Sequence, residues 1–180
     1  MKKIIMIMAV ATALFSCGQK QDSAASTTEA AKDSIGGLMT STDEKTLAFK
    51  ESAAAYIAND SVNYGKMYAD NVKTYWSNDT TVDVIGKKEH NATFLGHHKI
   101  FSNINNTRVR TMTITLGNGQ TWTNTWGVFS GKGIASGKDV MFPYHIVDLW
   151  QGDKIVAEYH FSDTKPFEVE AQAAAAAAKK

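Results

Sequence analysis

The second half of the sequence alternates apolar and polar residues, and this pattern limits the possible folds more than any other feature. Aliphatic side chains alternate with threonines up to Leu116, and the alternation resumes over residues 121–128 after the turn signal Gly117-Asn118-Gly119. A period of two predicts strands with one buried face, joined here by a tight hairpin. Val109 is out of phase with its neighbours, which predicts a β-bulge near Arg110.

Two more strands are predicted beyond a loop of glycine, serine and lysine residues at 130–138. The first, at 140–150, is apolar on both faces, and the second runs over 154–161 after the turn Gln151-Gly152-Asp153. One face of strand 140–150 can pack against helices, but the other face also needs a cover. A second copy of the sheet is the simplest cover, so the sequence predicts a homodimer.

The first half of the sequence predicts helices. The residues Ser41-Thr42-Asp43-Glu44 have the form of a capping box, so a helix is expected to begin there and to end near Ala58. A second, short helix is expected after Asp60, with Tyr64 and Tyr68 on one face.

Strands at 72–76 and 82–85 are predicted next, separated by a turn at 77–80, and a third helix is expected over 87–101. Helices followed by a run of strands indicate the α+β class. The expected architecture is a curved antiparallel sheet packed on about three N-terminal helices.

The N-terminus has the features of a secretion signal. Two lysines precede an apolar run from Ile4 to Phe15, which is shorter than the roughly 20 residues that span a bilayer. The run ends in Leu14-Phe15-Ser16-Cys17, which resembles a bacterial lipobox. The resemblance implies lipid attachment at Cys17 and anchoring in the bacterial cell envelope, and Gly18 favours the outer membrane. The alternative is an ordinary secretory signal with an incidental cysteine.

Composition divides the chain into four segments. Residues 1–16 are the predicted signal peptide, 17–42 carry the lipid anchor and a flexible tether, 43–168 form the domain, and 169–180 are an alanine-rich tail expected to be a frayed helix or disordered. Removal of the two signal-peptide lysines leaves 17 basic and 18 acidic residues, a net charge of −1. That balance argues against nucleic acid as a partner, and the single cysteine excludes an internal disulfide.

The last predicted hairpin carries a family motif. Trp150, Lys154-Ile155-Val156, Tyr159 and Asp163 take its aromatic, central and acidic positions, although Gly152-Asp153 reverses the usual Asp-Gly order. In these residues, and in the order of its elements, the chain resembles the nuclear transport factor 2-like superfamily, which includes ketosteroid isomerases and polyketide cyclases. The resemblance implies a cone-shaped sheet with a pocket between sheet and helices. It implies no single activity, because the superfamily also has non-catalytic and protein-binding members.

The sequence does not identify a catalytic group. The isomerases of this superfamily use an aspartate on the first strand, where this chain has Thr74-Tyr75-Trp76-Ser77. Asp148 and His145 are candidates for general acid–base chemistry, but a spacing of three points them to opposite faces of a regular strand. His160 and the pair His97-His98 are further candidates. The pair lacks a third ligand at a recognisable spacing, so neither a metal nor another cofactor is predicted.

Aromatic side chains and one amide are the candidates for ligand binding. Such side chains suit a pocket for a planar or apolar molecule, although they can also fill the core. The predicted ligand-binding residues are Tyr56, Trp76, Trp122, Asn124, Trp126, Tyr144, Trp150 and Tyr159. The sequence thus favours binding of a small hydrophobic or aromatic ligand without catalysis. The alternatives are a lyase or isomerase that uses a pocket Asp or His, and a protein-interaction module with an exposed apolar patch.

Overall fold

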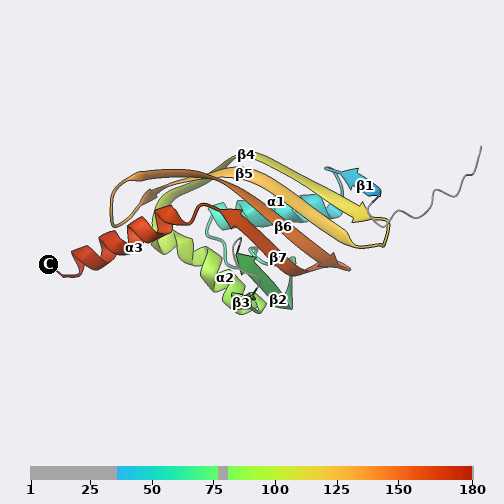
Figure 1. Ribbon diagram of the computed structural model, residues 1–180, viewed down its shortest axis with the longest axis horizontal. Helices are drawn as coiled ribbons and strands as arrows, with labels where there is room; N and C mark the ends of the chain where they lie inside the picture. The colour runs from blue at the N-terminus through green and yellow to red at the C-terminus, as the bar shows by residue number, and fades with distance from the viewer. Residues whose placement is uncertain (1–35, 77–80, 180) are drawn as a thin grey trace, which may run out of the picture. The chain divides into compact units, whose positions relative to one another are not determined.

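A computed structural model describes residues 36–76 and 81–179, which belong to one compact unit. The predicted signal peptide, the lipidation site Cys17 and the predicted turn at 77–80 lie outside the described residues. None of the described helices is long and apolar enough to cross a membrane. The elements, shown in Figure 1, are β1 (Gly37–Thr40), α1 (Glu44–Ile57), β2 (Tyr68–Trp76), β3 (Val84–Ile85), α2 (Lys87–Leu95), the short 3₁₀ helix η1 (Gly96–Lys99), β4 (Phe101–Leu116), β5 (Thr121–Gly133), β6 (Asp139–Gln151), β7 (Lys154–Ser162) and α3 (Lys165–Ala177).

Within the described residues, seven strands form one curved sheet in the order β1-β4-β5-β6-β7-β2-β3. Neighbouring strands pair antiparallel except β2 and β7, which run parallel with Tyr75 opposite Tyr159. The sheet is therefore mixed, and the prediction of antiparallel pairing is wrong at this one pair. The two strands are far apart in the sequence, so the hairpin signals that set the directions of β4 to β7 do not determine how β2 pairs.

The helices pack on the inner face of the sheet, with α1 against β4 and α2 against β2. Figure 1 shows the long strands β4 to β7 arching over α1. This arrangement confirms the predicted α+β class with a curved sheet on helices. The structure has three helices longer than a single turn, but only α1 and α2 precede the long strands, because α3 follows β7.

The predicted second helix does not form. Residues 61–67 make turns, and Tyr68 already belongs to β2. Asp60 accepts hydrogen bonds from the turn backbone, as a cap would, but Gly65 interrupts the segment with a φ of 82° in the left-handed region. A Cβ at Gly65 would also collide with the side chain of Asn91. The close approach of α2 therefore dictates a glycine turn where the tyrosine spacing predicts a helix.

The first helix begins where the sequence predicts, but with a different cap. The carboxylate of Asp43 accepts the backbone N–H of Thr46 at 3.0 Å and the hydroxyl of Thr113 at 2.8 Å. Ser41 of the predicted capping box does not cap the helix. Asp43 pairs with a free N–H of the first turn and also connects α1 to β4. Ser41 lies three residues before the helix and takes neither role.

Two further boundaries differ from the prediction. The third predicted helix ends at Leu95, and η1 leads from it into β4, so Phe101 lies in the sheet and is fully buried there. The predicted loop at 130–138 shortens to 134–138, because β5 continues to Gly133 and β6 begins at Asp139.

The predicted irregularity in β4 is confirmed. The register with β5 shifts between Thr107 and Arg110, and Arg108 adopts a φ of 54° there. The extra residue keeps the threonines beyond it on the inner face, where Thr111 and Thr113 are buried.

Both ends of the domain have more structure than the sequence predicts. β1, inside the predicted tether, pairs with β4, and Gly37 lies so close to the Thr115 carbonyl that a Cβ would not fit. Helix α3 covers most of the predicted alanine-rich tail, with Pro166 in its first turn. β1 pairs through its backbone groups, so it needs no apolar side chains to join the edge of the sheet. α3 forms because alanine favours the helix intrinsically, so it needs no apolar stripe either.

Two apolar clusters form the core between helices and sheet. One surrounds Val72 and Ile155, and the other surrounds Phe101. Val72 and Ile155 in the first cluster, and Phe101 in the second, are fully buried. Tyr56 of α1 packs against both clusters, so the space next to Tyr56 lies where the two meet.

Candidate functional site

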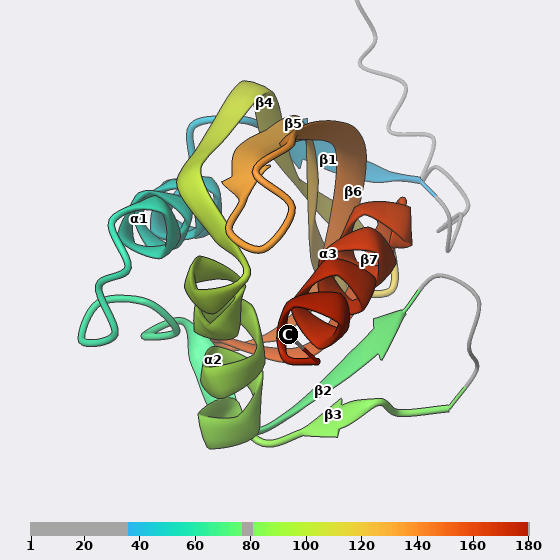
Figure 2. The ribbon, with the colours of Figure 1, turned by 90° about the vertical axis from the view of Figure 1, so that its left-hand side faces the viewer.

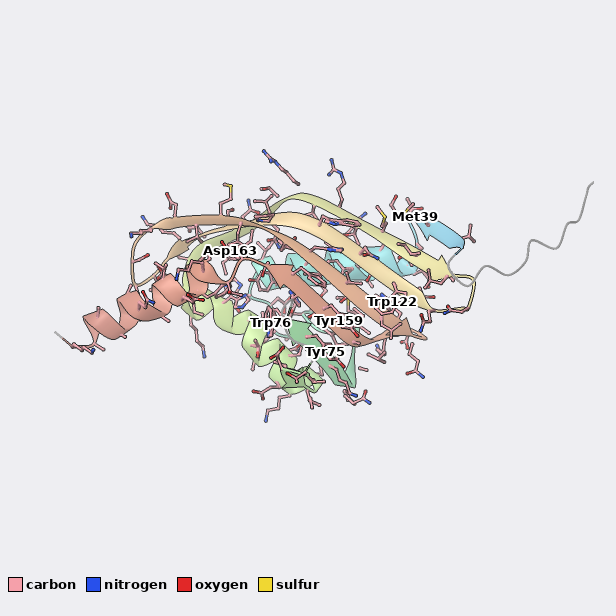
Figure 3. All side chains as sticks on the ribbon, viewed as in Figure 1. Met39, Tyr75, Trp76, Trp122, Tyr159 and Asp163 are labelled. Atoms are coloured by element: carbon pink, nitrogen blue, oxygen red, sulfur yellow. The ribbon has the colours of Figure 1, made fainter. Side chains whose placement is uncertain are left out.

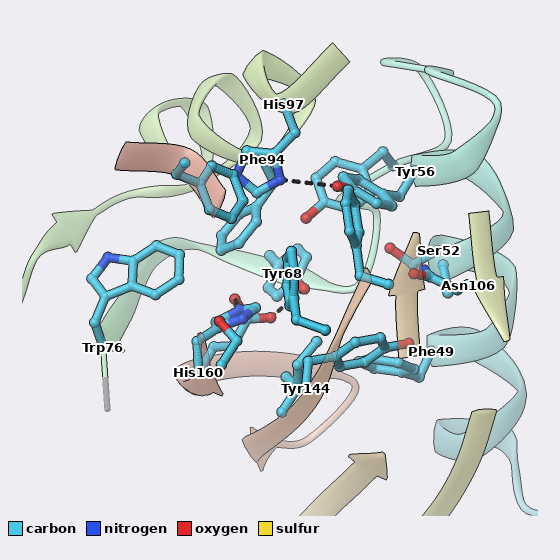
Figure 4. Close-up of a pocket in the computed structure, with 18 of the residues that line it drawn as sticks. Phe49, Ser52, Tyr56, Tyr68, Trp76, Phe94, His97, Asn106, Tyr144 and His160 are labelled. Carbon is cyan, nitrogen blue, oxygen red and sulfur yellow. Dashed lines mark hydrogen bonds and ion pairs between the residues drawn. The ribbon is translucent and has the colours of Figure 1, made fainter. Parts of the chain in front are cut away.

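A cavity of about 370 Å³ lies between the inner face of the sheet and the helices. Figure 4 shows it as a space enclosed by side chains from several elements. Its volume falls in the range of small-molecule sites, and such sites are mostly apolar with a few polar groups. The aromatic part of the lining consists of Phe49, Tyr56, Tyr64, Tyr68, Trp76, Phe94, Phe129, Phe142, Tyr144 and Phe167.

A buried carboxylate, that of Glu158, lies in the wall that β7 contributes. Its Oε1 accepts hydrogen bonds from Nε2 of His90 at 2.8 Å and from Nε2 of His160 at 2.6 Å, and its Oε2 accepts the hydroxyl of Tyr68 at 2.5 Å. Burial alone raises the pKa of Glu158, but His160 and His90 outweigh burial and hold that pKa well below its usual value. Glu158 is therefore an anion inside the protein.

The members of this cluster differ in access to the cavity. Tyr68, Glu158 and His160 line it, whereas His90 is fully buried and does not. The His160 ring stacks on Phe94 with centroids 4.6 Å apart and lies 5.0 Å from the Trp76 ring. A histidine that is oriented by a carboxylate and held between aromatic rings can accept and return a proton at a fixed point.

Asp148 lies across from Glu158 on the neighbouring strand β6. Burial, and then the charge of Glu158, raises the pKa of Asp148 well above its usual value, so Asp148 keeps its proton. Trp150 Nε1 donates to Thr123 Oγ1 at 3.0 Å, so the Thr123 hydroxyl donates its own proton to Asp148 Oδ2 at 2.8 Å. Asp148 does not line the cavity, and it adjoins the cluster through its strand neighbour Glu158.

A second polar pair joins α1 to η1. His97 Nδ1 lies 2.9 Å from the hydroxyl of Tyr56, a contact drawn in Figure 4. Burial lowers the pKa of His97 to about 4 and raises that of Tyr56. Both groups are therefore uncharged at neutral pH, and this part of the wall is polar without carrying charge.

Two polar atoms of the cavity wall have no hydrogen-bond partner among the described residues. They are Ser52 Oγ on α1 and Asn106 Oδ1 on β4, and both atoms are buried. Figure 4 shows Ser52 and Asn106 together on one side of the cavity, with Trp76 on the opposite side. An unpaired buried polar atom costs about 1–3 kcal/mol, so a ligand that pairs both atoms gains binding energy there.

Three of the eight predicted ligand-binding residues line this cavity, namely Tyr56, Trp76 and Tyr144. Burial raises the pKa of Tyr144 to about 12, and the absence of a side chain at Gly127 makes room for its ring. Trp150 is buried in the core beside the cavity without lining it. Ligand contact by the three lining residues stays a prediction.

The other four predicted residues do not line the cavity. The inner face of β5 presents Thr123 and Thr125, which are fully buried, so residues of the opposite parity lie on the outer face. Figure 3 shows Trp122 and Tyr159 in a row that continues to Tyr75. The residues placed away from the cavity are Trp122, Asn124, Trp126 and Tyr159.

Asp148 and His145 point to opposite faces of β6, as their spacing predicts. His145 lies on the outer side, stacked on Trp126 with centroids 4.6 Å apart, and its Nε2 is 3.2 Å from Asn124 Oδ1. Burial lowers the pKa of His145. Neither of the two residues lines the cavity, whereas the further candidate His160 does.

Sequence reasoning missed Glu158 and its partners His90 and Tyr68. One signal was available, because Glu158 and His160 are two residues apart in a predicted strand and therefore share a face. His90 and Tyr68 reach the carboxylate only through the packing of α2 and β2, which no local pattern reveals. Within residues 36–76 and 81–179, no group of three or more His, Cys, Asp or Glu side chains is arranged to hold a metal ion.

No protein-family model and no curated protein matches the sequence. Solved structures do match. A proposed polyketide cyclase from Pseudomonas putida KT2440 is 14% identical, with 68% of this chain and 94% of that chain covered and a TM-score of 0.57. A proposed SnoaL-like polyketide cyclase from Jannaschia sp. CCS1 is 10% identical, with 70% and 90% covered and a TM-score of 0.57.

A third match is a hypothetical protein with a ketosteroid isomerase-like fold from Catenulispora acidiphila DSM 44928, solved in complex with trimethylamine. It is 12% identical, with 63% of this chain and 83% of that chain covered and a TM-score of 0.52. Identities this low show a common fold and nothing more. The chain therefore has the fold of the ketosteroid isomerase-like and SnoaL-like polyketide cyclase proteins, which agrees with the nuclear transport factor 2-like superfamily.

Proposed function

We propose that this protein is a lipoprotein of the bacterial cell envelope whose domain binds a small, largely apolar ligand without transforming it. The observation that carries the proposal is the cavity of about 370 Å³, with its aromatic walls and the unpaired atoms of Ser52 and Asn106. Aromatic side chains favour a planar or hydrophobic ligand, and a polar group on that ligand would form hydrogen bonds with the two unpaired atoms.

The charges around the cavity restrict the ligand further. Glu158 is anionic, and its repulsion and the cost of desolvation disfavour a second anion. His97 and Tyr56 are neutral and offer hydrogen bonds only. The best-fitting class is an uncharged aromatic or alicyclic molecule that bears a hydroxyl, aromatic amine or amide group.

Ligand binding is tested by filling the cavity from α1. Ala53 lines the cavity, whereas the next residue, Ala54, is exposed on the same helix. We expect the neutral fluorophore N-phenylnaphthylamine to bind the wild-type protein with an increase in fluorescence. Ala53→Phe is expected to weaken that binding at least about tenfold, because the ring takes the ligand's space.

Ala54→Phe is the matched control and is expected to bind the fluorophore like the wild type. Circular dichroism checks that both variants are folded. Absence of binding to the wild type, or equal binding by both variants, contradicts a ligand site in the cavity. Native mass spectrometry of protein purified from its own host then identifies a natural ligand by mass.

The envelope location rests on the lipobox-like residues around Cys17. Acyl chains contribute about 0.8 kcal/mol per buried CH₂ group, and the near-neutral chain needs them because no basic cluster attracts it to lipid. Cys17→Ser is expected to abolish incorporation of labelled fatty acid and to release the protein from the membrane fraction. Retention of the variant in the outer-membrane fraction would contradict the anchor.

A second candidate function is general acid–base catalysis as a lyase or isomerase. The specific observation that favours it is His160, which lines the cavity while its Nε2 is held 2.6 Å from the Glu158 carboxylate. The group that would accept a proton is His160, and Glu158 would orient its ring and stabilise its positive charge. The raised pKa of Asp148 keeps it protonated, and His145 lies on the outer face, so neither residue can act as the base in the cavity.

Nitrobenzisoxazole tests this second candidate, because it is a neutral planar molecule whose N–O bond breaks, to give a nitrile and a phenolate, when a base removes the proton on its isoxazole carbon. A catalytic His160 predicts saturable ring opening that falls at least about 100-fold in His160→Gln. His145→Gln is the matched histidine control and should react like the wild type. If the fluorophore binds but no ring opening occurs, ligand binding remains the proposed function and base catalysis on such a substrate is excluded.

A further inference from the structure

The C-terminal helix α3 lies at one end of the ligand cavity. Figure 1 shows α3 projecting from this end of the domain, and in Figure 2 it lies in front of β7, to the right of α2. The connection from β7 brings Ser162 and Thr164 into the cavity lining just before the helix begins. The position of α3 therefore determines how this end of the cavity meets solvent.

One side chain of α3, that of Phe167, forms part of the cavity wall. Its ring centroid lies 4.9 Å from that of His97, 5.1 Å from that of Phe101 and 5.9 Å from that of Phe142. These contacts join α3 to η1, β4 and β6 at once. Phe167 thus forms part of the cavity wall only while α3 stays in place.

A second side chain of α3, Glu170, holds the helix to the loop between β5 and β6. Its Oε2 accepts the backbone N–H of Ala135 at 3.0 Å and that of Ser136 at 3.2 Å, and its Oε1 accepts the hydroxyl of Ser136. Hydrogen bonds to a charged acceptor are stronger than neutral ones. We call this contact between Glu170 and residues 135–136 the latch.

The sheet makes space for the latch at Gly133. A Cβ at this position would collide with the carboxylate of Glu170. Gly133 has no left-handed backbone angle, so its lack of a side chain serves the contact and not the conformation of the chain. The loop and the last residue of β5 are therefore shaped to receive this one carboxylate.

The rest of α3 contributes little to its attachment. Glu170 is its only buried residue, and the alanines beyond it are mostly exposed. Phe167 and Glu170 are three residues apart and share a face of the helix. An element attached by two side chains opens at a lower free-energy cost than the sheet unfolds.

We propose that α3 is a gate of the ligand cavity, closed by Phe167 and kept closed by the latch. Opening of the latch lets α3 swing away as a unit and exposes the cavity to a ligand from solvent. The gate rests on the proposed function for its purpose, but its opening can be measured without any ligand.

The test uses a thiol inside the cavity of the full chain. Cys17→Ser removes the only natural cysteine, and Ser52→Cys then places a single thiol in the wall, in a side chain that is 5% exposed. Labelling by the neutral reagent dithiodipyridine reports how often the cavity opens. We expect Glu170→Gln and Gly133→Ala each to raise the labelling rate about tenfold, because each one breaks the latch.

Two matched controls are expected to label at the rate of the parent. Glu168→Gln changes an exposed glutamate on the same helix that pairs only with Lys165, and Gly96→Ala adds a Cβ where nothing lies within 4 Å. Equal rates in all variants would overturn the gate. It would also be overturned if Ile155→Val, which weakens the core cluster that Phe167 does not join, raised labelling as much as the latch variants do.

This experiment separates the gate from the proposed function. If the latch variants label faster but the wild type does not bind N-phenylnaphthylamine, the gate holds and the ligand proposal fails. If the fluorophore binds but the latch variants label at the rate of the parent, the ligand proposal holds and the gate proposal fails. In the supporting case, both latch variants also speed the association and the dissociation of the fluorophore.

Discussion

The carboxyl group of Asp148 lies next to an anion in a place that water does not reach. Asp148 is 0% exposed, and Glu158 across the strand pair is 1% exposed. Two such carboxylates cannot both ionise at a tolerable cost, and the histidines keep Glu158 charged. The proton therefore stays on Asp148, and its folded-state pKa is above its unfolded value.

This raised pKa makes stability depend on pH with a definite sign. A group that binds its proton more tightly in the folded state stabilises the fold fully at low pH, and the contribution is lost as pH rises through the folded-state pKa. Asp148→Asn keeps an acceptor for Thr123 and has no proton to lose. We expect the free energies of unfolding of variant and wild type to agree within about 1 kcal/mol near pH 4.

Towards pH 7 the Asp148→Asn variant is expected to become progressively more stable than the wild type, as measured by urea titration at each pH. Glu158→Gln is the contrasting change and should cost about 3 kcal/mol or more at pH 7, because His90, His160 and Tyr68 lose a charged acceptor. A difference between Asp148→Asn and wild type that is constant with pH would show that Asp148 is ionised.

The sequence could place individual residues on faces but could not bring them together. Strand parity separates Asp148 from His145 correctly, and the structure keeps them apart. The buried cluster needs His90 from α2 and Tyr68 from β2 at one carboxylate, and these residues are far apart in the chain. Such a meeting depends on how the helices pack, which a period of two or 3.6 does not encode.

Among the elements, β5 shows why Trp122, Asn124 and Trp126, which the sequence predicts as ligand-binding, lie away from the cavity. Its outer positions hold tryptophans and its inner positions hold threonines, so hydrophobicity alone points the strand the wrong way round. The inner threonines are buried because they bond to one another and to the core, as Thr125 does to Thr111 at 3.1 Å. Polar residues that satisfy each other can line a core, and this possibility reverses the usual assignment of faces.

Helix α1 offers a test of its observed cap against the predicted one. Asp43→Ala removes the acceptor of the Thr46 N–H and of the Thr113 hydroxyl, so we expect a loss of about 1–2 kcal/mol in the free energy of unfolding. Ser41→Ala should change it by less than about 0.5 kcal/mol. Urea denaturation followed by circular dichroism measures both. A larger loss of stability in Ser41→Ala than in Asp43→Ala would instead support the capping box that begins at Ser41.

At the scale of the whole molecule, the outer face of the sheet is rich in aromatic side chains. Trp126, His145 and Phe161 stack across three strands with centroids 4.6 Å and 5.7 Å apart. Trp126 is 40% exposed and Phe161 is 43% exposed. Exposed aromatic rings suit a protein interface, and a twofold pairing of two sheets is the arrangement that the sequence predicts.

The homodimer is therefore a prediction that a single charge can test. We expect the unanchored Cys17→Ser protein to have the mass of a dimer in light scattering after size exclusion. Adding Trp126→Lys should shift it to a monomer, because a lysine at the centre of an apolar interface is buried without a partner. Val62→Lys, at a residue that is 76% exposed in the turn before β2, is the control. A monomeric parent protein would contradict the prediction.

The parallel pairing of β2 with β7 also sets the order in which the chain can fold. Tyr75 finds its neighbour Tyr159 only when nearly the whole domain is available, and the cluster around Val72 and Ile155 depends on the same late strand. Sheets that join such distant segments form slowly. If the proposed signal peptide directs export, this delay keeps the chain unfolded, and so able to pass through a translocation channel, at least until its last strand has been synthesised.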